Sequence, residues 1–316
     1  MPQVQTATGP IDTADLGQTL MHEHVAMLSH SVRANVPGAW DPDAVAERCA
    51  ARLRDVMQRG VRTIVDLSTV DLERDVALVA DAARRSGCQI IVATGCWWRP
   101  PAYFASAPIE WLVELWTREI TEGIAGTGIR AGIIKLATDR EGVTPAIEKM
   151  LRAGARTHRA TGVPISTHTD VSTRRGEDQQ RIFAEEGVDL SRIVIGHSGD
   201  STDLDYLKGL IARGSTIGMD RFGLEGISPF EARVDVVAAL CREGYAGQMV
   251  LSHDASAEWG GFPGVDNRAA RMPHWHYNHI HDDVLPALRE RGVTEQQIQQ
   301  MLVDNPRRIF ERQGAY

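Results

Sequence analysis

One repeating unit organises this chain: an amphipathic stretch ends at a glycine, and a short apolar run follows it. The unit occurs seven times along the sequence. Glycine ends a helix at little cost because it readily adopts the left-handed conformation that a C-cap requires. The apolar runs show little polar alternation, which is typical of strands buried on both faces. The repeat therefore predicts helices and strands in strict alternation.

One more strand, at 19–21, precedes the first unit, so the sequence predicts eight strands. Eight strands alternating with helices favour a closed (β/α)8 TIM barrel, with its active site at the carboxyl ends of the strands. No linker or low-complexity segment interrupts the repeat, so we expect residues 1–316 to form one domain, closed by helices at 293–302 and 305–310. The predicted strands are 19–21, 63–66, 90–93, 133–136, 163–167, 193–196, 216–219 and 249–252.

Composition argues against several classes of partner. The chain carries 34 Lys and Arg against 42 Asp and Glu, a net charge of −8, which disfavours binding to nucleic acid. No apolar run reaches the roughly 18 residues of a transmembrane helix, and residues 1–5 lack the features of a secretory signal. The four cysteines form no C-x-x-C pair, which predicts a reducing, cytoplasmic location and no thiolate metal site.

Side chains that can bind metal ions fall at the ends of five predicted strands. In a (β/α)8 barrel these ends meet at one mouth, where the chemistry takes place. Two of the histidines form an H-x-H pair, whose members point to the same side of a strand. The candidate ligands are His22, His24, Lys135, His168, His197 and Asp254. Together they predict a binuclear metal centre.

Taken singly, these residues have structural alternatives. H-x-H pairs also occur at 274/276 and 279/281, which we interpret as capping and packing residues. His168 and His197 could be ordinary polar residues at strand ends, and Asp254 could be a helix N-cap. A buried ammonium is costly, so Lys135 is either paired with a carboxylate or carboxylated by CO2 to bridge two metal ions. The presence of all six side chains at one mouth favours the metal centre.

Several motifs resemble the phosphotriesterase family of the amidohydrolase superfamily, and the resemblance covers nearly the whole chain. The motifs are LMHEH at 20–24, GIIK at 132–135, STHT at 166–169, IGHSGD at 195–200 and LSHD at 251–254. The resemblance implies that His22, His24 and Asp254 hold the more buried of two divalent metal ions. It implies that His168 and His197 hold the more exposed ion.

The same resemblance implies that carboxylated Lys135 and a hydroxide bridge the two ions. Zinc is the first expectation, with cobalt, manganese or iron as alternatives. The segment 218–224 resembles the phosphotriesterase-like lactonases, in which the arginine matching Arg221 lies beside the metals at the substrate pocket. The loop 95–101 is more similar to that of the phosphotriesterases proper, which place a tryptophan there. A homodimer is also implied.

We therefore predict a metal-dependent hydrolase that opens lactones, such as N-acyl homoserine lactones or other γ- and δ-lactones, with promiscuous hydrolysis of organophosphate triesters. The alternatives are a phosphotriesterase, or a carboxylester or amide hydrolase on the same site. A non-catalytic binding protein would have no need for a carboxylated lysine. The predicted catalytic residues are Asp254, Lys135 and Arg221. The predicted substrate-binding residues are Trp97, Trp98, Arg221 and Trp259, with the loop 256–264 as a lid.

Overall fold

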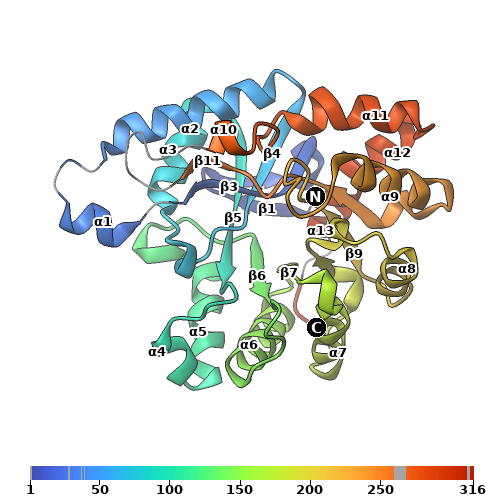
Figure 1. Cartoon of the computed structure of the whole chain (residues 1–316). Coiled ribbons are helices and arrows are strands. Elements are labelled where there is room, and N and C mark those ends of the chain that lie inside the picture. The colour runs from blue at the N-terminus through green and yellow to red at the C-terminus, as the bar shows by residue number, and fades with distance from the viewer. Residues whose placement is uncertain (1, 28, 37, 39, 260–267, 312–313) are drawn as a thin grey trace.

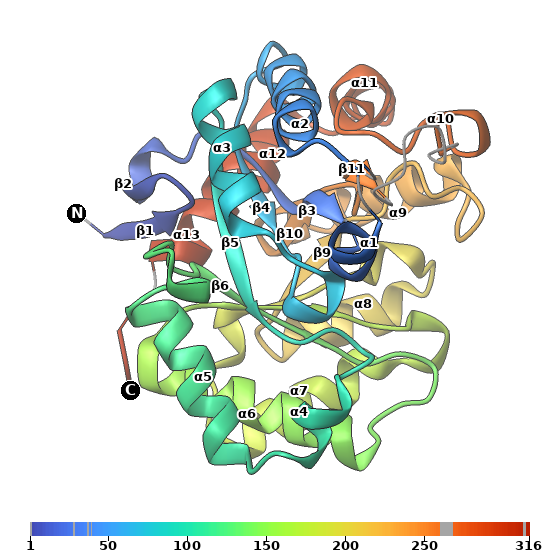
Figure 2. The same cartoon turned by 90° about the vertical axis from the view of Figure 1, so that its left-hand side faces the viewer.

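A parallel sheet of nine strands curls around the centre of the molecule, and helices cover its outside (Figures 1 and 2). The structure is a computed structural model that describes residues 2–27, 29–36, 38, 40–259, 268–311 and 314–316. The strand order is β10–β9–β8–β7–β6–β5–β4–β3–β11. The (β/α)8 barrel expected from the sequence repeat is therefore confirmed.

The predicted strands coincide with β3 to β10. The strands of the sheet are β3 (Gln18–Met27), β4 (Val61–Asp66), β5 (Gln89–Gly95), β6 (Ile133–Ala137), β7 (Ile165–His168), β8 (Ile193–Ile195), β9 (Thr216–Met219), β10 (Met249–Leu251) and β11 (Ser256–Trp259). β3 is longer than predicted because its second half pairs with β11, a strand that the sequence did not indicate. A small antiparallel hairpin of β1 (Gln3–Thr6) and β2 (Gly9–Asp12) was also not predicted.

The helices begin and end at the signals that the sequence carries. The Asp41 side chain caps the first turn of α2, where Pro42 occupies the first helical position. Gly87 and Gly162 end α3 and α6 with φ of 79° and 76°. The helices are α1 (His30–Asn35), α2 (Pro42–Met57), α3 (Val76–Ser86), α4 (Ala102–Ser106), α5 (Ile109–Thr121), α6 (Pro145–Thr161), α7 (Arg175–Glu185), α8 (Leu204–Ala212), α9 (Phe230–Arg242), α10 (Arg268–Arg271), α11 (Leu285–Glu290), α12 (Glu295–Gln299) and α13 (Asn305–Glu311).

The last strand closes the barrel against the first. The amide of Asp254 donates to the carbonyl of His22 at 3.0 Å, and the amide of His24 donates to the carbonyl of Ala255 at 2.8 Å. At the carboxyl end of the chain, α12 continues through a π-helical segment, 300–304, into α13, so the two predicted closing helices form one continuous helical run. Within the described ranges, no helix is long and apolar enough to cross a membrane.

Candidate metal centre and active site

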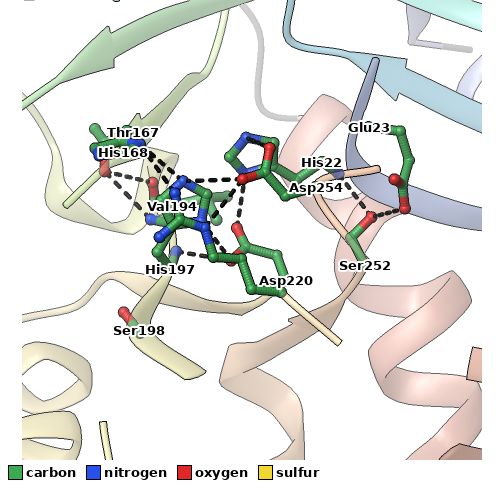
Figure 3. A network of polar contacts seen from close by, with 12 residues as sticks. His22, Glu23, Thr167, His168, Val194, His197, Ser198, Asp220, Ser252 and Asp254 are labelled. Atoms are coloured by element: carbon green, nitrogen blue, oxygen red, sulfur yellow. Dashed lines mark hydrogen bonds and ion pairs between the residues drawn. The ribbon is translucent and has the colours of Figure 1, made fainter. Parts of the chain in front are cut away.

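The barrel brings all six predicted metal ligands together at the carboxyl ends of its strands. His22 and His24 project from β3, and Asp254 follows β10. The donor atoms of these three residues lie within 4.8 Å of one another. On the other side of the cluster, Nε2 of His197 lies 3.0 Å from Nδ1 of His168. Figure 3 shows His22, His168, His197 and Asp254 directed towards one another.

Asp220, at the end of β9, accepts hydrogen bonds from the Nδ1 atoms of two of the histidines. Its Oδ2 accepts a hydrogen bond from Nδ1 of His22 at 2.7 Å. Its Oδ1 accepts from the amide and from Nδ1 of His197, at 2.7 and 3.0 Å. The side chain is 1% exposed, and although burial opposes it, the facing His22 and Lys135 keep the pKa of this carboxyl below its usual range. An ionised carboxylate only accepts, so both histidines carry their hydrogen on Nδ1.

Asp139 and Ser68 play the same part for the other two histidines. Nε2 of His168 donates to Oδ2 of Asp139 at 3.0 Å, and this bond lowers the pKa of Asp139 to about 2. Nδ1 of His24 lies 2.9 Å from the hydroxyl of Ser68. Oxygen partners of this kind fix the ring orientation of metal-binding histidines. Asp220, Asp139 and Ser68 were not predicted to be functional, because a single carboxylate or hydroxyl carries no distinctive spacing of its own.

These outer hydrogen bonds leave two nitrogen lone pairs facing each other. Burial lowers the pKa of His168 to about 4 and that of His197 well below its ordinary value, so both rings are neutral at pH 7. His197 carries its hydrogen on Nδ1, and His168 carries its hydrogen on Nε2. The facing atoms, 3.0 Å apart, therefore have no hydrogen between them. A cation satisfies such a pair, so these residues fit a divalent metal.

Lys135 is buried at the floor of the cluster. Its Nζ lies 2.8 Å from Nε2 of His22, so its hydrogen-bond partner is a nitrogen rather than a carboxylate. Burial lowers the pKa of Lys135 to about 8. A neutral amine is the form that reacts with CO2, and the carbamate would supply oxygens to the cluster. Of the two alternatives for Lys135, this geometry fits carboxylation better than a carboxylate pair.

Arg221 joins Asp254 to a second buried carboxylate. Its Nε donates to Oδ2 of Asp254, and its Nη1 donates to Oδ2 of Asp200, each at 3.0 Å. Asp200 also forms an ion pair of 2.6 Å with Arg233. Nη2 of Arg221 lies 3.5 Å from Nδ1 of His168. Arg221 therefore contacts two of the candidate ligands, Asp254 and His168.

A cavity of about 210 Å³ opens above the cluster. Of the predicted substrate-binding residues, Trp97, Arg221 and Trp259 line it, together with the unpredicted Trp275. Trp98 is absent from this lining as far as the described residues go; it meets Trp97 edge to face at 5.3 Å instead. Residues 260–264 of the predicted lid lie outside the described residues.

Comparisons with known proteins agree with this geometry. A sequence profile of the Phosphotriesterase family matches residues 2–310. The solved structure of the phosphotriesterase from Mycobacterium tuberculosis is 53% identical, covers 100% of both chains and superposes with a TM-score of 0.95. An aryldialkylphosphatase from Saccharolobus solfataricus is 35% identical over 95% of this chain and 96% of its own length. A structure from molecular engineering of organophosphate hydrolysis from a weak promiscuous lactonase template is 39% identical, covers 98% of this chain and 99% of its own, and has a TM-score of 0.91.

Proposed function

Because the chain belongs to the phosphotriesterase family, whose members are metal-dependent hydrolases, we propose that it opens lactones at the mouth of its barrel. The observation that carries the metal requirement is the pair of unprotonated nitrogens of His168 and His197, 3.0 Å apart. In this proposal His22, His24 and Asp254 hold one divalent ion, zinc in the first instance. The nitrogens of His168 and His197 hold the second.

Carboxylated Lys135 would contribute to both ions. Its neutral amine would form a bond to the carbon of CO2 and lose one proton to solvent, and the resulting carbamate would offer two oxygens as metal ligands. When bound, two such ions would supply Lewis acidity, which lowers the pKa of a water molecule and polarises the substrate oxygen. We also propose that the protein is a homodimer in the cytoplasm.

Protein side chains provide proton transfer and orientation. Asp254 lies between the two halves of the cluster, and although burial opposes it, the Arg221 guanidinium that donates to this carboxylate keeps its pKa well below the usual range. It is therefore ionised at neutral pH and can take a proton from the attacking water and return it to the leaving alkoxide. Arg221 donates to Asp254 and faces the cavity, so it orients this carboxylate and attracts the negative charge that develops on the substrate.

The shape of the cavity supports a lactone over a triester. Ligand pockets commonly measure about 300–1,000 Å³, whereas this cavity measures about 210 Å³ and has walls of tryptophan and leucine. A lactone presents one flat ring at the reacting centre, and its tail can leave through the open mouth. A phosphotriester places three organic groups around a tetrahedral phosphorus and requires more room. The resemblance of 218–224 to the lactonases points the same way.

The test is kcat/KM on one metal-loaded preparation for an N-acyl homoserine lactone and an aryl dialkyl phosphate. We expect the lactone to be favoured about a thousandfold, which corresponds to roughly 4 kcal/mol of transition-state binding. A preference for the phosphate would refute the lactone proposal and favour the activity for which the Saccharolobus solfataricus relative is named. Negligible turnover of both would direct the search to other esters and amides.

A further inference from the structure

Glu23 is a fully buried carboxylate that lies between two proposed metal ligands in the sequence and takes no part in the cluster. It is on β3 between His22 and His24, and its side chain has an exposure of 0%. Side chains alternate across a strand, so Glu23 points away from the side that His22 and His24 share. Figure 3 shows it reaching towards Ser252, at the end of β10. A buried carboxyl group of this kind requires several hydrogen-bond partners.

Among the described residues, Glu23 has four hydrogen-bond donors, and all of them come from the segment 252–255. Oε1 accepts from the Ser252 hydroxyl at 2.8 Å, from the His253 amide at 2.9 Å and from His253 Nδ1 at 2.6 Å. Oε2 accepts from the Ala255 amide at 2.8 Å. The one residue of the segment that does not donate to Glu23 is Asp254. Its amide donates instead to the carbonyl of His22.

This segment holds Asp254 in an unfavourable backbone conformation. Asp254 has a φ of 57°, in the left-handed region that residues with a Cβ rarely adopt. Such a conformation persists only where neighbouring contacts impose it. The donors from His253 and Ala255 stand on either side of Asp254, and both end on the carboxylate of Glu23. The hydrogen bonds to the Glu23 side chain therefore stabilise the turn at Asp254.

The histidine of this arrangement has a fixed tautomer. Nε2 of His253 accepts from the amide of Ile280 at 3.0 Å, so the ring hydrogen is on Nδ1 and is donated to Glu23. From the outer side, Nε1 of Trp275 donates to the carbonyl of His253 at 2.9 Å. Trp275 also lines the catalytic cavity. The hydrogen bonds of His253 thus connect Trp275 in the cavity wall to Glu23 on β3.

We propose that Glu23 is a positioning residue that sets the place of the Asp254 carboxylate in the metal centre. By gathering the donors of 252–255, it imposes the turn that places Asp254 between His22 and His24. The inference rests on the proposed metal centre, in which Asp254 is a ligand. A role in packing alone would require a side chain of this volume, but not one that accepts at both oxygens.

The substitution Glu23→Gln separates these two roles because it keeps the volume and removes one acceptor. In either orientation its NH2 group faces an N–H or O–H donor of the segment. We expect the variant to fold and to bind metal about 10- to 100-fold more weakly, the usual effect of losing an outer partner of a metal site. Metal-free protein is titrated with Zn²⁺ and with Co²⁺ in competition with a chelator. The visible spectrum of the cobalt form should also change, because it reports the ligand geometry.

A matched control is Glu119→Gln, which also removes a largely buried carboxylate. Glu119 accepts from Arg74 at 2.8 and 3.1 Å and from Thr94 at 2.5 Å, under β5 and away from Asp254. We expect this control to lose stability and to keep its metal affinity and cobalt spectrum. Equal metal affinity in Glu23→Gln and the wild type would overturn the inference, as would equal losses in Glu23→Gln and Glu119→Gln.

A second pair of variants keeps the test decisive if Glu23→Gln does not fold. His253→Asn retains a donor close to the position of Nδ1, whereas His253→Ala removes it. Both variants lose the acceptor for the amide of Ile280, so their difference isolates the bond to Glu23. We expect the asparagine variant to bind metal at least about 10-fold more tightly than the alanine variant; equal affinities would overturn the inference. Wild-type protein that binds no metal would instead refute the proposed function.

Discussion

Replacing Asp220 with asparagine should weaken the metal centre without removing any proposed ligand. In the structure its two oxygens accept three hydrogen bonds from His22 and His197. Asparagine has one oxygen and one NH2 group. Because Oδ1 serves two donors and Oδ2 serves one, the favoured orientation places NH2 towards Nδ1 of His22. That ring then escapes the clash by moving its hydrogen from Nδ1 to Nε2.

The moved hydrogen blocks the atom of His22 that faces the cluster. To bind metal through Nε2, His22 must move its hydrogen back to Nδ1. Nδ1–H then faces the NH2 group of the introduced asparagine, and this buried contact between two donors costs about 1–3 kcal/mol. This corresponds to a loss of affinity of roughly 5- to 150-fold. The loss should fall first on the ion held by His22, so chelator titration of the variant should show one weakened site and one closer to wild type. Far-UV circular dichroism verifies that the barrel is folded.

Asp139→Asn provides the graded comparison for this prediction. Asp139 also supports one ligand ring, that of His168, but its side chain is 23% exposed, whereas Asp220 is at 1%. Water can replace a lost partner at Asp139 and cannot do so at Asp220. The loss of affinity should therefore be clearly smaller in Asp139→Asn. An equal or larger loss of metal affinity in Asp139→Asn would show that burial of the histidine's hydrogen-bond partner does not control metal affinity, and would refute this prediction.

Four further predictions test other parts of the structure. Lys135→Ala should abolish both metal binding and hydrolysis; full metal occupancy by elemental analysis with unchanged turnover would contradict its bridging role. Arg221→Ala should keep both ions but change the ratio of kcat/KM between lactone and phosphotriester, by up to about 1.5–3 kcal/mol in barrier height; loss of metal would instead give Arg221 a structural role. Gly95→Ala should lower the free energy of unfolding in urea by about 1–3 kcal/mol or more, because Gly95 has a φ of 110° and a Cβ there would lie 2.0 Å from the carbonyl of Lys135; an unchanged urea midpoint would refute this. Burial lowers the pKa of His158, whose Nε2 accepts from the Tyr316 hydroxyl at 2.8 Å. As the pH drops below about 6.5, the imidazole is therefore protonated in the unfolded chain before it is protonated in the folded protein, and the free energy of unfolding should fall. His158→Gln should reduce this pH dependence by at most about 1.4 kcal/mol per pH unit.

The sequence was sufficient to predict the barrel and the convergence of the six candidate ligands at its mouth, for identifiable physical reasons. Helix-ending glycines and short apolar runs are local signals, and each appears in the structure where the sequence carries it. The positions of His168 and His197 follow from the barrel itself, which brings strand ends together whatever lies between them. The ligand residues were therefore recognisable as a set once eight strands had been counted.

Residues that act through other residues were not predictable in this way. Asp220 and Asp139 are functional because of the ring nitrogens they face, and Glu23 because of the segment that donates to it. These contacts depend on side-chain direction and on strand register, which no local pattern specifies. β11 was missed for a related reason: its partner is the far half of β3, more than 200 residues earlier in the chain. Trp98 illustrates the converse, since a neighbour of a pocket residue need not line the pocket.

The closure of the last strand on the first also determines when the site can form. Glu23 and the donors that surround Asp254 are separated by about 230 residues of chain. Contacts of such sequence separation form late, because the entropy of a very long loop is lost before they are gained. During synthesis a chain that ends before β10 can present several of the histidines but not the completed ligand set. The ion proposed at His22, His24 and Asp254 would therefore bind tightly only after the barrel has closed. Its binding would stabilise the folded barrel rather than nucleate folding.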